Sequence, residues 1–292
     1  MQPEAALRLH VESDALAHNW RVLDRLSGAA SAGAAVKADG YGLGAARVVP
    51  ALLAAGCRNF FVAHWSEVEP LLALVDPGSI AVLHGPLTAR DANYARSVGV
   101  RPVINSLHQA ALWRDAGGGA CDLMVDTGMN RLGLPLAELA DPLVAGLDID
   151  VLHSHLASAE EAVPLNALQL QRWNEARGIV RHRRASLANS AGIALGSDYH
   201  GDLTRPGIAL YGGVPCAALA GEIRQVARPE AAIMQVRTVA AGEGIGYNST
   251  FVAEREMRVG VISLGYADGY LRCWSGKGTM QAGDARLPVL GR

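Results

Sequence analysis

The sequence lacks the features of a metal-binding, nucleic-acid-binding or membrane-spanning protein. Its four cysteines lie far apart with no CxxC or other metal-ligand spacing, so we expect free thiols in a reducing compartment and no metal site. The net charge of -2 provides no basic surface for nucleic acid or for an anionic membrane. No apolar run approaches the length that spans a bilayer, and the N-terminus has no basic segment leading into an apolar core. We therefore expect a cytoplasmic protein without nucleic-acid or membrane partners.

Charged residues are also scarce. They make up 18% of the chain, below the roughly 25% typical of soluble domains, while 50% of the residues are apolar. Much of the chain should therefore be buried in its own core or in a subunit interface. The 292 residues suffice for one (β/α)8 barrel plus part of another domain, or for two ordinary domains.

Short apolar runs alternate with amphipathic segments through the first 225 residues. A strand at 6–11 precedes a helix that Ser13 or Asp14 can cap, and further helices are expected at 45–55 and 166–180. An eighth strand falls at 202–205 or at 208–211, and we choose the former because it places Arg205 at the strand's C-terminal end. The alternation predicts an α/β protein with a (β/α)8 TIM-type barrel over residues 11–225. The seven other runs suited to buried parallel strands are 34–38, 59–64, 80–83, 100–104, 123–125, 149–152 and 185–188.

The pattern changes after residue 225. Apolar runs at 232–241 and 257–264 have no amphipathic helix between them, and a glycine-rich turn lies at 242–246. We assign residues 1–10 and 226–292 to a second, mainly β domain. Within it, Tyr266 projects from a glycine-flanked turn, a pattern that by itself favours an ordinary turn with an aromatic residue over a functional site.

Polar residues recur where the barrel strands are expected to end. In such a barrel, ligands bind at the C-terminal ends of the strands, and phosphate often lies in the loops after strands seven and eight. Each residue alone has a plain structural interpretation, such as a solvated lysine at a strand end or a satisfied core histidine, but five positions in register favour a binding site. They are Lys37 after strand one, Arg131 after strand five, His155 at the end of strand six, Asn189 and Ser190 after strand seven, and the segment 205–208 after strand eight.

Lys37 ends a short apolar run and is followed by Gly40, Gly42 and Gly44, which allow a ligand to approach the backbone closely. A lysine at a pocket wall beside a phosphate-compatible set of groups suits an aldimine with pyridoxal phosphate. Desolvation and neighbouring cations would lower the pKa of this lysine and make it a better nucleophile and base. The phosphate would be held by the backbone N–H groups of Gly207 and Ile208, the Ser190 hydroxyl and the Tyr41 phenol.

Arg205 has a separate expected role. Because a guanidinium does not readily lose its proton, Arg205 placed against the pyridine nitrogen would keep that nitrogen unprotonated. The ring would then be a weaker electron sink, which favours a short-lived carbanion over side reactions.

Six motifs spread over nearly the whole chain resemble the alanine racemase family. They are AVKADGYGLG around Lys37, VDTGMNRLG at 125–133, HSHLA at 153–157, ANSAG at 188–192, RPGIALYGG at 205–213 and GYADGY at 265–270. Each motif is weak alone, but their number and order make the match specific. The resemblance implies a barrel and a β domain packed head to tail in a homodimer, and an isomerase that supplies D-alanine for the cell wall.

The resemblance also implies roles for individual residues. Lys37 would hold the cofactor and act as the base on D-alanine, and Tyr266 of the partner subunit would act on the L face. Racemisation needs two bases on opposite faces, because one base that returns its own proton tends to preserve configuration. His155 would hydrogen-bond Tyr266 and be oriented by Arg205, while Arg131 would contact the cofactor phenolate and the substrate carboxylate. The expected cofactor-binding set is Lys37, Tyr41, His155, Asn189, Ser190, Arg205, Gly207 and Ile208.

The chain departs from the family pattern at several positions. Leu43 stands where histidine is usual and Glu160 where aspartate is common, and we expect both to be tolerated. Met124 stands where many members have a lysine that is carbamylated to an anion, and a thioether cannot supply that charge to Arg131. The final segment 287–292 resembles the start of a motif that the family continues, so we expect a C-terminally truncated β domain.

Three other interpretations remain open at this stage. The first is a racemase that acts on serine or on several small amino acids. The second is a non-catalytic pyridoxal phosphate carrier on the same barrel, although such carriers lack Tyr266 and the β domain. The third is a decarboxylase or aldolase on a related scaffold, of which the aldolase would require a metal site that the sequence does not offer.

Overall fold

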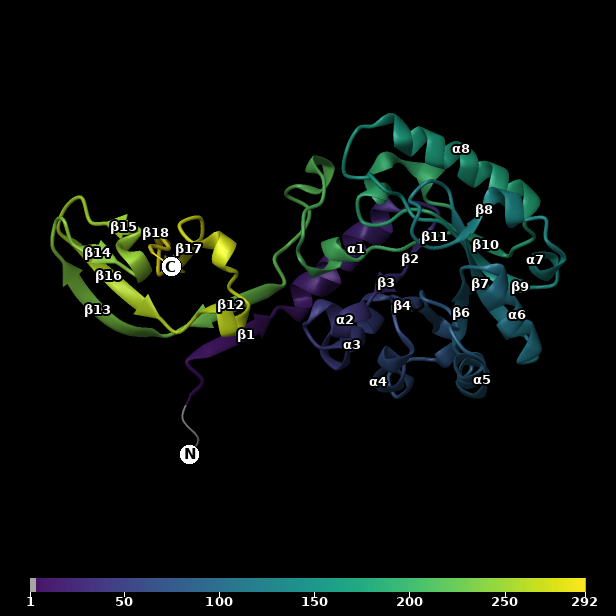
Figure 1. Ribbon diagram of the computed structural model, residues 1–292, viewed down its shortest axis with the longest axis horizontal. Helices are drawn as coiled ribbons and strands as arrows, with labels where there is room; N and C mark the ends of the chain where they lie inside the picture. Colours follow the sequence, from purple (N-terminus) through teal and green to yellow (C-terminus); the bar gives the residue numbers. More distant parts are fainter. Residues whose placement is uncertain (1–3, 292) are drawn as a thin grey trace. The chain divides into compact units, whose positions relative to one another are not determined.

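The computed structural model describes residues 4–291, which divide into two compact units (Figure 1). The first unit consists of residues 11–227, and the second combines the described residues before 11 with those after 227. The sequence placed a change of domain near residue 225, and the ends of that assignment, residues 1–3 and Arg292, lie outside the described residues.

A parallel sheet forms the centre of the first unit. Its strands follow the order β10-β9-β7-β6-β5-β4-β3, and the short strand β8 (Leu134–Pro135) pairs with β7. Each of the seven coincides with a run expected to be a buried strand, so these predictions are confirmed. Their bounds are β3 (Ala34–Ala35), β4 (Phe60–Val62), β5 (Ile80–Val82), β6 (Arg101–Ile104), β7 (Ala120–Asp126), β9 (Asp148–His153) and β10 (Arg184–Ser186).

The segment 202–206 closes the sheet into a barrel. Strand β11 (Leu203–Thr204) pairs in parallel with β2 (Ser31–Ala32), which is separated from β3 by Gly33. The Gly33 N–H donates to the Thr204 carbonyl at 2.9 Å, and the Arg205 N–H donates to the Ala188 carbonyl beyond β10 at 2.8 Å. The segment 202–205 is therefore the eighth strand position, as expected, whereas Ile208–Tyr211 forms a 3₁₀ helix.

Helices lie on the outside of this sheet (Figure 1). Alternate strand residues point inward and fill the barrel with a small apolar cluster, while the opposite faces pack against the helices. The inner cluster comprises Ala35, Phe61, Ala81, Val103, Met124, Val151 and Leu203. The helices are α1 (Ser13–Leu26), α3 (Ala45–Ala55), α4 (Glu69–Leu72), α5 (Ala89–Val98), α6 (Leu107–Asp115), α7 (Pro142–Ala145) and α8 (Pro164–Ile179).

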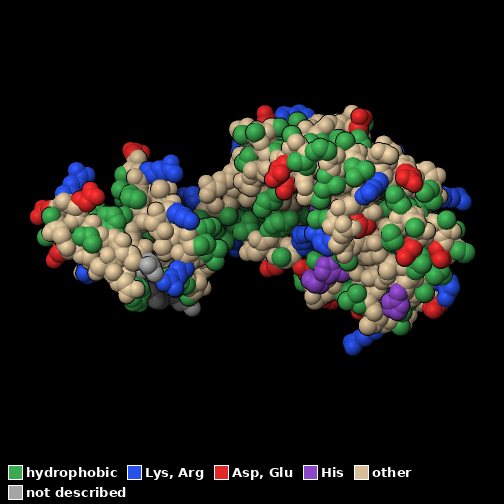
Figure 2. Space-filling model, turned by 45° about the horizontal axis from the view of Figure 1, so that its top comes forward, with side chains coloured by type: hydrophobic (Ala, Val, Ile, Leu, Met, Phe, Trp, Pro, Cys, Tyr) green, Lys and Arg blue, Asp and Glu red, His purple; other side chains and the backbone are tan. Residues whose placement is uncertain are grey.

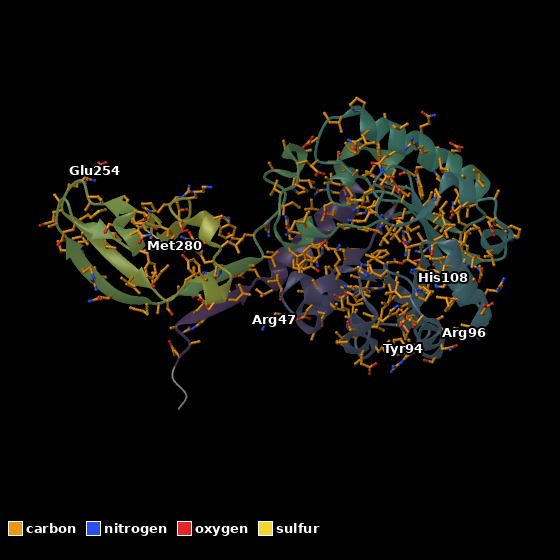
Figure 3. All side chains as sticks on the ribbon, in the orientation of Figure 1. Arg47, Tyr94, Arg96, His108, Glu254 and Met280 are labelled. Carbon is orange, nitrogen blue, oxygen red and sulfur yellow. The ribbon has the colours of Figure 1, made fainter. Side chains whose placement is uncertain are left out.

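Local sequence explains where several helices begin. Thr88 and Asp91 form a capping box at the start of α5, and the Ser106 hydroxyl caps α6. The expected cap of α1 was wrong: the helix already begins at Ser13, and Glu12 occupies the N-cap position without a side-chain cap. Arg96 on α5 and His108 on α6 are exposed, whereas Tyr94 on α5 is half-buried and packs edge-on against Trp65 (Figure 3 labels the first three). No helix within residues 4–291 is long and apolar enough to cross a membrane.

The second unit is mainly β, as the sequence predicted. Strand β1 (Leu7–Val11) pairs with β12 (Ala227–Ala231), and the longest ladder is the antiparallel pair β13 (Ile233–Val239) and β16 (Met257–Ile262). Two hairpin-like pairs complete it: β14 (Gly244–Ile245) with β15 (Phe251–Val252), and β17 (Thr279–Ala282) with β18 (Ala285–Pro288).

Candidate active site

A cavity of about 670 Å³ lies at the C-terminal ends of the barrel strands. Its size is typical of sites that bind cofactors and small molecules. Every site residue that the sequence placed in the first unit lines this cavity, and so do Met124 and Glu160. The predicted residues that line it are Lys37, Tyr41, Arg131, His155, Asn189, Ser190, Arg205, Gly207 and Ile208.

Tyr266 belongs to the second unit. It begins the 3₁₀ helix Tyr266–Asp268, in which the Asp268 carboxylate accepts a hydrogen bond from the Gly265 N–H at 2.9 Å. The Tyr266 side chain is 56% exposed. The cavity is built from first-unit residues alone, so the second expected base comes from a different unit than Lys37.

An unusual backbone turn presents Lys37 to the cavity. The sequence predicted a strand through residue 38, but β3 ends at Ala35 and Lys37 begins the short helix α2 (Lys37–Tyr41). Ala38, Asp39 and Tyr41 have φ values of 53°, 52° and 57°, in the left-handed region that residues with a Cβ rarely adopt. Such strain persists only where the surroundings enforce it, and it clusters at functional sites.

Two carboxylates hold this turn in place. Glu67 Oε1 accepts a hydrogen bond from the Ala38 N–H at 2.6 Å, and Asp39 Oδ1 accepts one from the Ala45 N–H at 2.7 Å. Glu67 Oε2 also accepts from the Ala63 N–H after strand β4, at 2.7 Å. Glu67 therefore joins the Lys37 turn to the neighbouring strand end.

The surroundings favour the neutral amine of Lys37. Burial lowers its pKa below the ordinary value, the nearby Arg131 lowers it further, and Glu67 acts in the opposite direction. A neutral amine is a nucleophile and a base, whereas an ammonium ion is neither.

Tyr41 is fixed between an aromatic ring and a glycine. Its ring stacks on Tyr211 with centroids 4.4 Å apart, and the Tyr211 hydroxyl donates to the Ala35 carbonyl at 2.9 Å. On the other side, a Cβ atom at Gly207 would lie 2.2 Å from the Tyr41 hydroxyl oxygen. Only glycine at position 207 leaves room for this phenol at the cavity wall.

The loop after the eighth strand offers donors suited to an anion. The Ser190 hydroxyl oxygen accepts from the N–H groups of Gly207 and Ala209 at 2.9 and 3.3 Å. These bonds join Ser190 to the segment 207–209 and form what we call the phosphate corner. The Ile208 N–H has no acceptor within residues 4–291. Asn189 lines the cavity, and its side-chain oxygen accepts from the Gly192 N–H at 2.9 Å, at the start of the 3₁₀ helix Gly192–Leu195. The Ile208 N–H and the Ser190 hydroxyl hydrogen are the donors that this corner leaves for an anion such as phosphate, because the Gly207 N–H is already bonded to Ser190.

Arg205 is buried at the base of the cavity. Its Nη1 donates to the Ser186 carbonyl at 2.8 Å and to the Ser186 hydroxyl, and its Nη2 donates to the Ser154 carbonyl. Nε is left without an acceptor among the described residues. Burial lowers the pKa of Arg205 to about 10, so the guanidinium stays charged at neutral pH.

The histidine that contacts Arg205 is His153 rather than His155. Arg205 Nη1 lies 3.2 Å from His153 Nδ1, and the described residues show no hydrogen bond between Arg205 and His155. Strand β9 ends at His153, so His155 lies in the loop beyond it and lines the cavity. No direct hydrogen bond therefore carries the expected orientation of His155 by Arg205, which stays a prediction, although Arg205 is close enough to affect the pKa of His155. Burial, Arg205 and Arg131 together lower the pKa of His155 to about 3, so its ring is neutral.

Arg131 and Met124 both line the cavity, and Met124 is 7% exposed. Arg131 itself is exposed, and no hydrogen bond or ion pair to it occurs in the described part of the chain. It remains directed at the cavity without an anion at position 124.

Histidine and basic side chains are also close together on the surface of the first unit (Figure 2).

Sequence reasoning missed four polar residues of this region. Glu67 and His84 lie near the cavity mouth, and His84 lines it and packs edge-on against His64 with ring centroids 4.3 Å apart. Asp122 and His153 lie beneath the cavity floor. His84 could have been found from its position, because it directly follows an expected strand. Asp122 could have been found because a charged residue in an apolar strand needs a buried partner.

Two family models match the chain. The one described as alanine racemase, N-terminal domain, covers residues 11–215, and the one described as alanine racemase, C-terminal domain, covers residues 226–292.

Individual relatives agree with these matches. The alanine racemase of Methylobacterium nodulans is 43% identical over 97% of this chain and 79% of its own length, and that of Rhizobium meliloti is 44% identical over 94% and 75%. Among solved structures, alanine racemase from Bartonella henselae with covalently bound pyridoxal phosphate superposes with a TM-score of 0.90 at 35% identity, covering 99% of this chain and 83% of that one. Biosynthetic alanine racemase from Pseudomonas aeruginosa also has a TM-score of 0.90, at 33% identity, covering 99% and 84%.

Proposed function

Because this chain belongs to the alanine racemase family, we propose that it interconverts L- and D-alanine with pyridoxal phosphate bound covalently to Lys37. The product D-alanine would serve the cell wall, and the reaction would take place in the cytoplasm. Four unpaired cysteines are compatible with a reducing compartment.

The observation that carries this proposal is the position of Lys37. It is the one lysine in the sequence of the first unit, it lines the cavity, and its pKa is lowered by burial and by Arg131. A strained turn fixed by Glu67 holds it there. A surface lysine would need neither the strain nor the desolvation.

The remaining residues of the cavity fit pyridoxal phosphate. The corner of Ser190, Gly207 and Ile208 would hold the phosphate, with the Tyr41 hydroxyl beside it, and Arg205 Nε would face the pyridine nitrogen. Once bound, the cofactor would withdraw electrons from the α-carbon of alanine and make its hydrogen acidic. A charged guanidinium against the ring nitrogen would keep that nitrogen unprotonated and so limit side reactions.

Two bases would move the α-proton. The neutral Lys37 amine would take the proton of D-alanine, and Tyr266 of the partner subunit would take that of L-alanine on the opposite face. This role for Tyr266 requires a homodimer in which the second unit of one chain completes the cavity of the other. His155 would hydrogen-bond this tyrosine as a neutral acceptor, since burial keeps its pKa low.

Arg131 would bind the substrate carboxylate and the cofactor phenolate. Its guanidinium lines the cavity and has no ion pair among residues 4–291, so its donors are free for a ligand. Charge-assisted hydrogen bonds to a carboxylate are strong, and an arginine can form two in parallel.

The test is to incubate the purified protein and pyridoxal phosphate with L-alanine and to measure D-alanine, beside Lys37→Ala and Tyr266→Phe. We expect racemisation by the natural sequence, none by Lys37→Ala, and a loss of about 10²–10⁴-fold for Tyr266→Phe, the usual contribution of a general base. Cofactor bound at Lys37 without D-alanine would indicate a non-catalytic carrier instead. A parallel assay with L-serine distinguishes a broad-specificity or serine racemase.

A further inference from the structure

A continuous chain of buried polar groups runs beneath the cavity from Arg101 to Arg205. Arg101 Nε lies 3.2 Å from Asp122 Oδ1, Asp122 Oδ2 lies 3.1 Å from His153 Nε2, and His153 Nδ1 lies 3.2 Å from Arg205 Nη1. Asp122 and His153 are fully buried, and the two arginines are nearly so. Burying Asp122 and His153 is costly unless both are paired, and each has a partner on either side, so the arrangement of these two residues is strongly determined.

The chemistry of these groups fixes the position of one proton. Burial acts to raise the pKa of Asp122, but Arg101 and the His153 hydrogen bond outweigh it and hold the pKa below its ordinary value. The carboxylate is therefore ionised and can only accept, so the hydrogen between Asp122 and His153 sits on Nε2. Burial lowers the pKa of His153 to about 4, which leaves Nδ1 with a lone pair directed at Arg205.

The lone pair on Nδ1 matters because every Arg205 nitrogen is a donor. In the other tautomer, a His153 N–H would face an Arg205 N–H, and Asp122 would lose its donor. With the observed pairing, His153 joins the Ser186 and Ser154 oxygens in binding the two Nη atoms. These contacts together fix the guanidinium plane and leave Nε as the nitrogen available to a ligand.

We infer that Asp122 and His153 are positioning residues: Asp122 selects the His153 tautomer that accepts from Arg205, and His153 thereby holds Arg205 Nε toward the pyridine nitrogen of the cofactor. The last step rests on the proposed function. The tautomer itself is a property of the cofactor-free protein and can be measured independently.

Asp122→Asn is the informative variant, with Asp150→Asn as its matched control. Both aspartates lie beside Arg101, with Asp150 Oδ2 3.6 Å from Arg101 Nε, but Asp150 pairs with Arg184 at 2.6 Å and does not contact His153. Both variants remove one negative charge next to the same arginine. Only Asp122→Asn replaces the oxygen that faces His153, because the other oxygen remains engaged by Arg101 and the Val151 N–H.

The first readout uses histidine-labelled cofactor-free protein. Long-range ¹⁵N–¹H correlation spectra show which ring nitrogen carries the proton, and the His153 signal is assigned by its absence in His153→Gln. We expect Nε2–H in the natural sequence and in Asp150→Asn, and a change of tautomer in Asp122→Asn. An Nδ1–H tautomer in the natural sequence, or an unchanged tautomer in Asp122→Asn, would overturn the inference even if the protein proves to be an active racemase.

The second readout uses the holoenzyme. Asp122→Asn should weaken pyridoxal phosphate binding or lower kcat by about tenfold or more, the scale on which groups that orient a functional side chain act, while the KM for alanine changes little. His153→Gln, whose amide can accept from Arg205 and donate to Asp122, should retain more activity than His153→Leu. Equal losses in Asp122→Asn and Asp150→Asn, or in the two His153 variants, would show a merely structural role. If the natural sequence does not racemise alanine, the proposed function fails. The His153 tautomer and the cofactor affinity still decide whether Asp122 and His153 position Arg205.

Discussion

Gly207 and Tyr41 pack so closely that a Cβ atom at position 207 would lie 2.2 Å from the Tyr41 hydroxyl oxygen. Gly207→Ala should therefore push the phenol away from the phosphate corner and disturb its stacking on Tyr211. We expect the dissociation constant for pyridoxal phosphate to rise by about tenfold, since displacing one charge-assisted hydrogen bond costs roughly 1.5 kcal/mol. Absorbance titration of the cofactor-free protein measures it.

Gly178→Ala is the control for this change. Gly178 lies within α8 and has open space where a Cβ would be added. Alanine is favoured over glycine in a helix by about 0.5–1 kcal/mol, so this variant should be slightly more stable and bind the cofactor normally. Equal cofactor affinity in the two variants would show that the Tyr41 hydroxyl does not contribute to phosphate binding.

The two lysines of the chain allow the attachment site to be mapped directly. Lys37 lies in the cavity with a lowered pKa, whereas Lys277 lies in the second unit. Borohydride reduction of the protein with pyridoxal phosphate, followed by peptide mass spectrometry, should label Lys37. Lys277→Arg should leave the labelling unchanged, and a label found mainly on Lys277 would contradict the proposed site.

The sequence predicted the barrel because its signals were local. Short apolar runs separated by amphipathic helices fix the strand positions, and the barrel then brings the polar residues after each strand to one end. Lys37, His155, Ser190 and Arg205 could be assigned to one cavity in this way without any knowledge of side-chain contacts.

The details that the sequence did not reveal depend on tertiary partners. The strand around Lys37 ends early because the left-handed turn at Ala38 and Asp39 is held by Glu67, which is distant in sequence. The HSHLA motif contains two histidines, and only the end of β9 at His153 decides which of them meets Arg205. Pattern alone contains no information on such pairings.

Glu67 is expected to set the pKa of Lys37 as well as its position. The carboxylate raises that pKa against the effects of burial and Arg131, so Glu67→Gln should lower it further. With Lys277→Arg as background, Lys37 is the one remaining lysine, and ¹³C NMR of the reductively methylated, cofactor-free protein follows its titration. Glu69→Gln, at an exposed position on α4, should have no effect. The same Lys37 titration in Glu67→Gln and Glu69→Gln would disprove this electrostatic role.

His153 should make the protein less stable in mild acid. Its pKa is about 4 in the folded state against an ordinary 6.5, so between these values the unfolded state binds more protons. The free energy of unfolding is therefore unaffected above pH 6.5 and falls as the pH drops from 6.5 toward 4. For this one histidine, the loss at pH 5 is about 2 kcal/mol.

Urea unfolding at pH 7 and pH 5 measures this effect. His153→Gln should lose less stability between the two pH values than the natural sequence does, by about the same 2 kcal/mol. His108→Gln, on the exposed side of α6 (Figure 3), should keep the full pH dependence. Identical pH dependence in the natural sequence and His153→Gln would show that another group causes the acid sensitivity.

The proposed mechanism requires Lys37 of one chain and Tyr266 of the partner subunit to act on the same alanine. It is tested most directly by co-expressing Lys37→Ala and Tyr266→Phe chains with different tags, purifying the mixed dimer and measuring D-alanine formed from L-alanine. Each variant alone should be inactive or nearly so, whereas the mixed dimer contains one cavity with both bases and should recover up to half of the natural activity per dimer. A mixed dimer that binds pyridoxal phosphate at its intact Lys37 but forms no more D-alanine than the parent variants would contradict the claim.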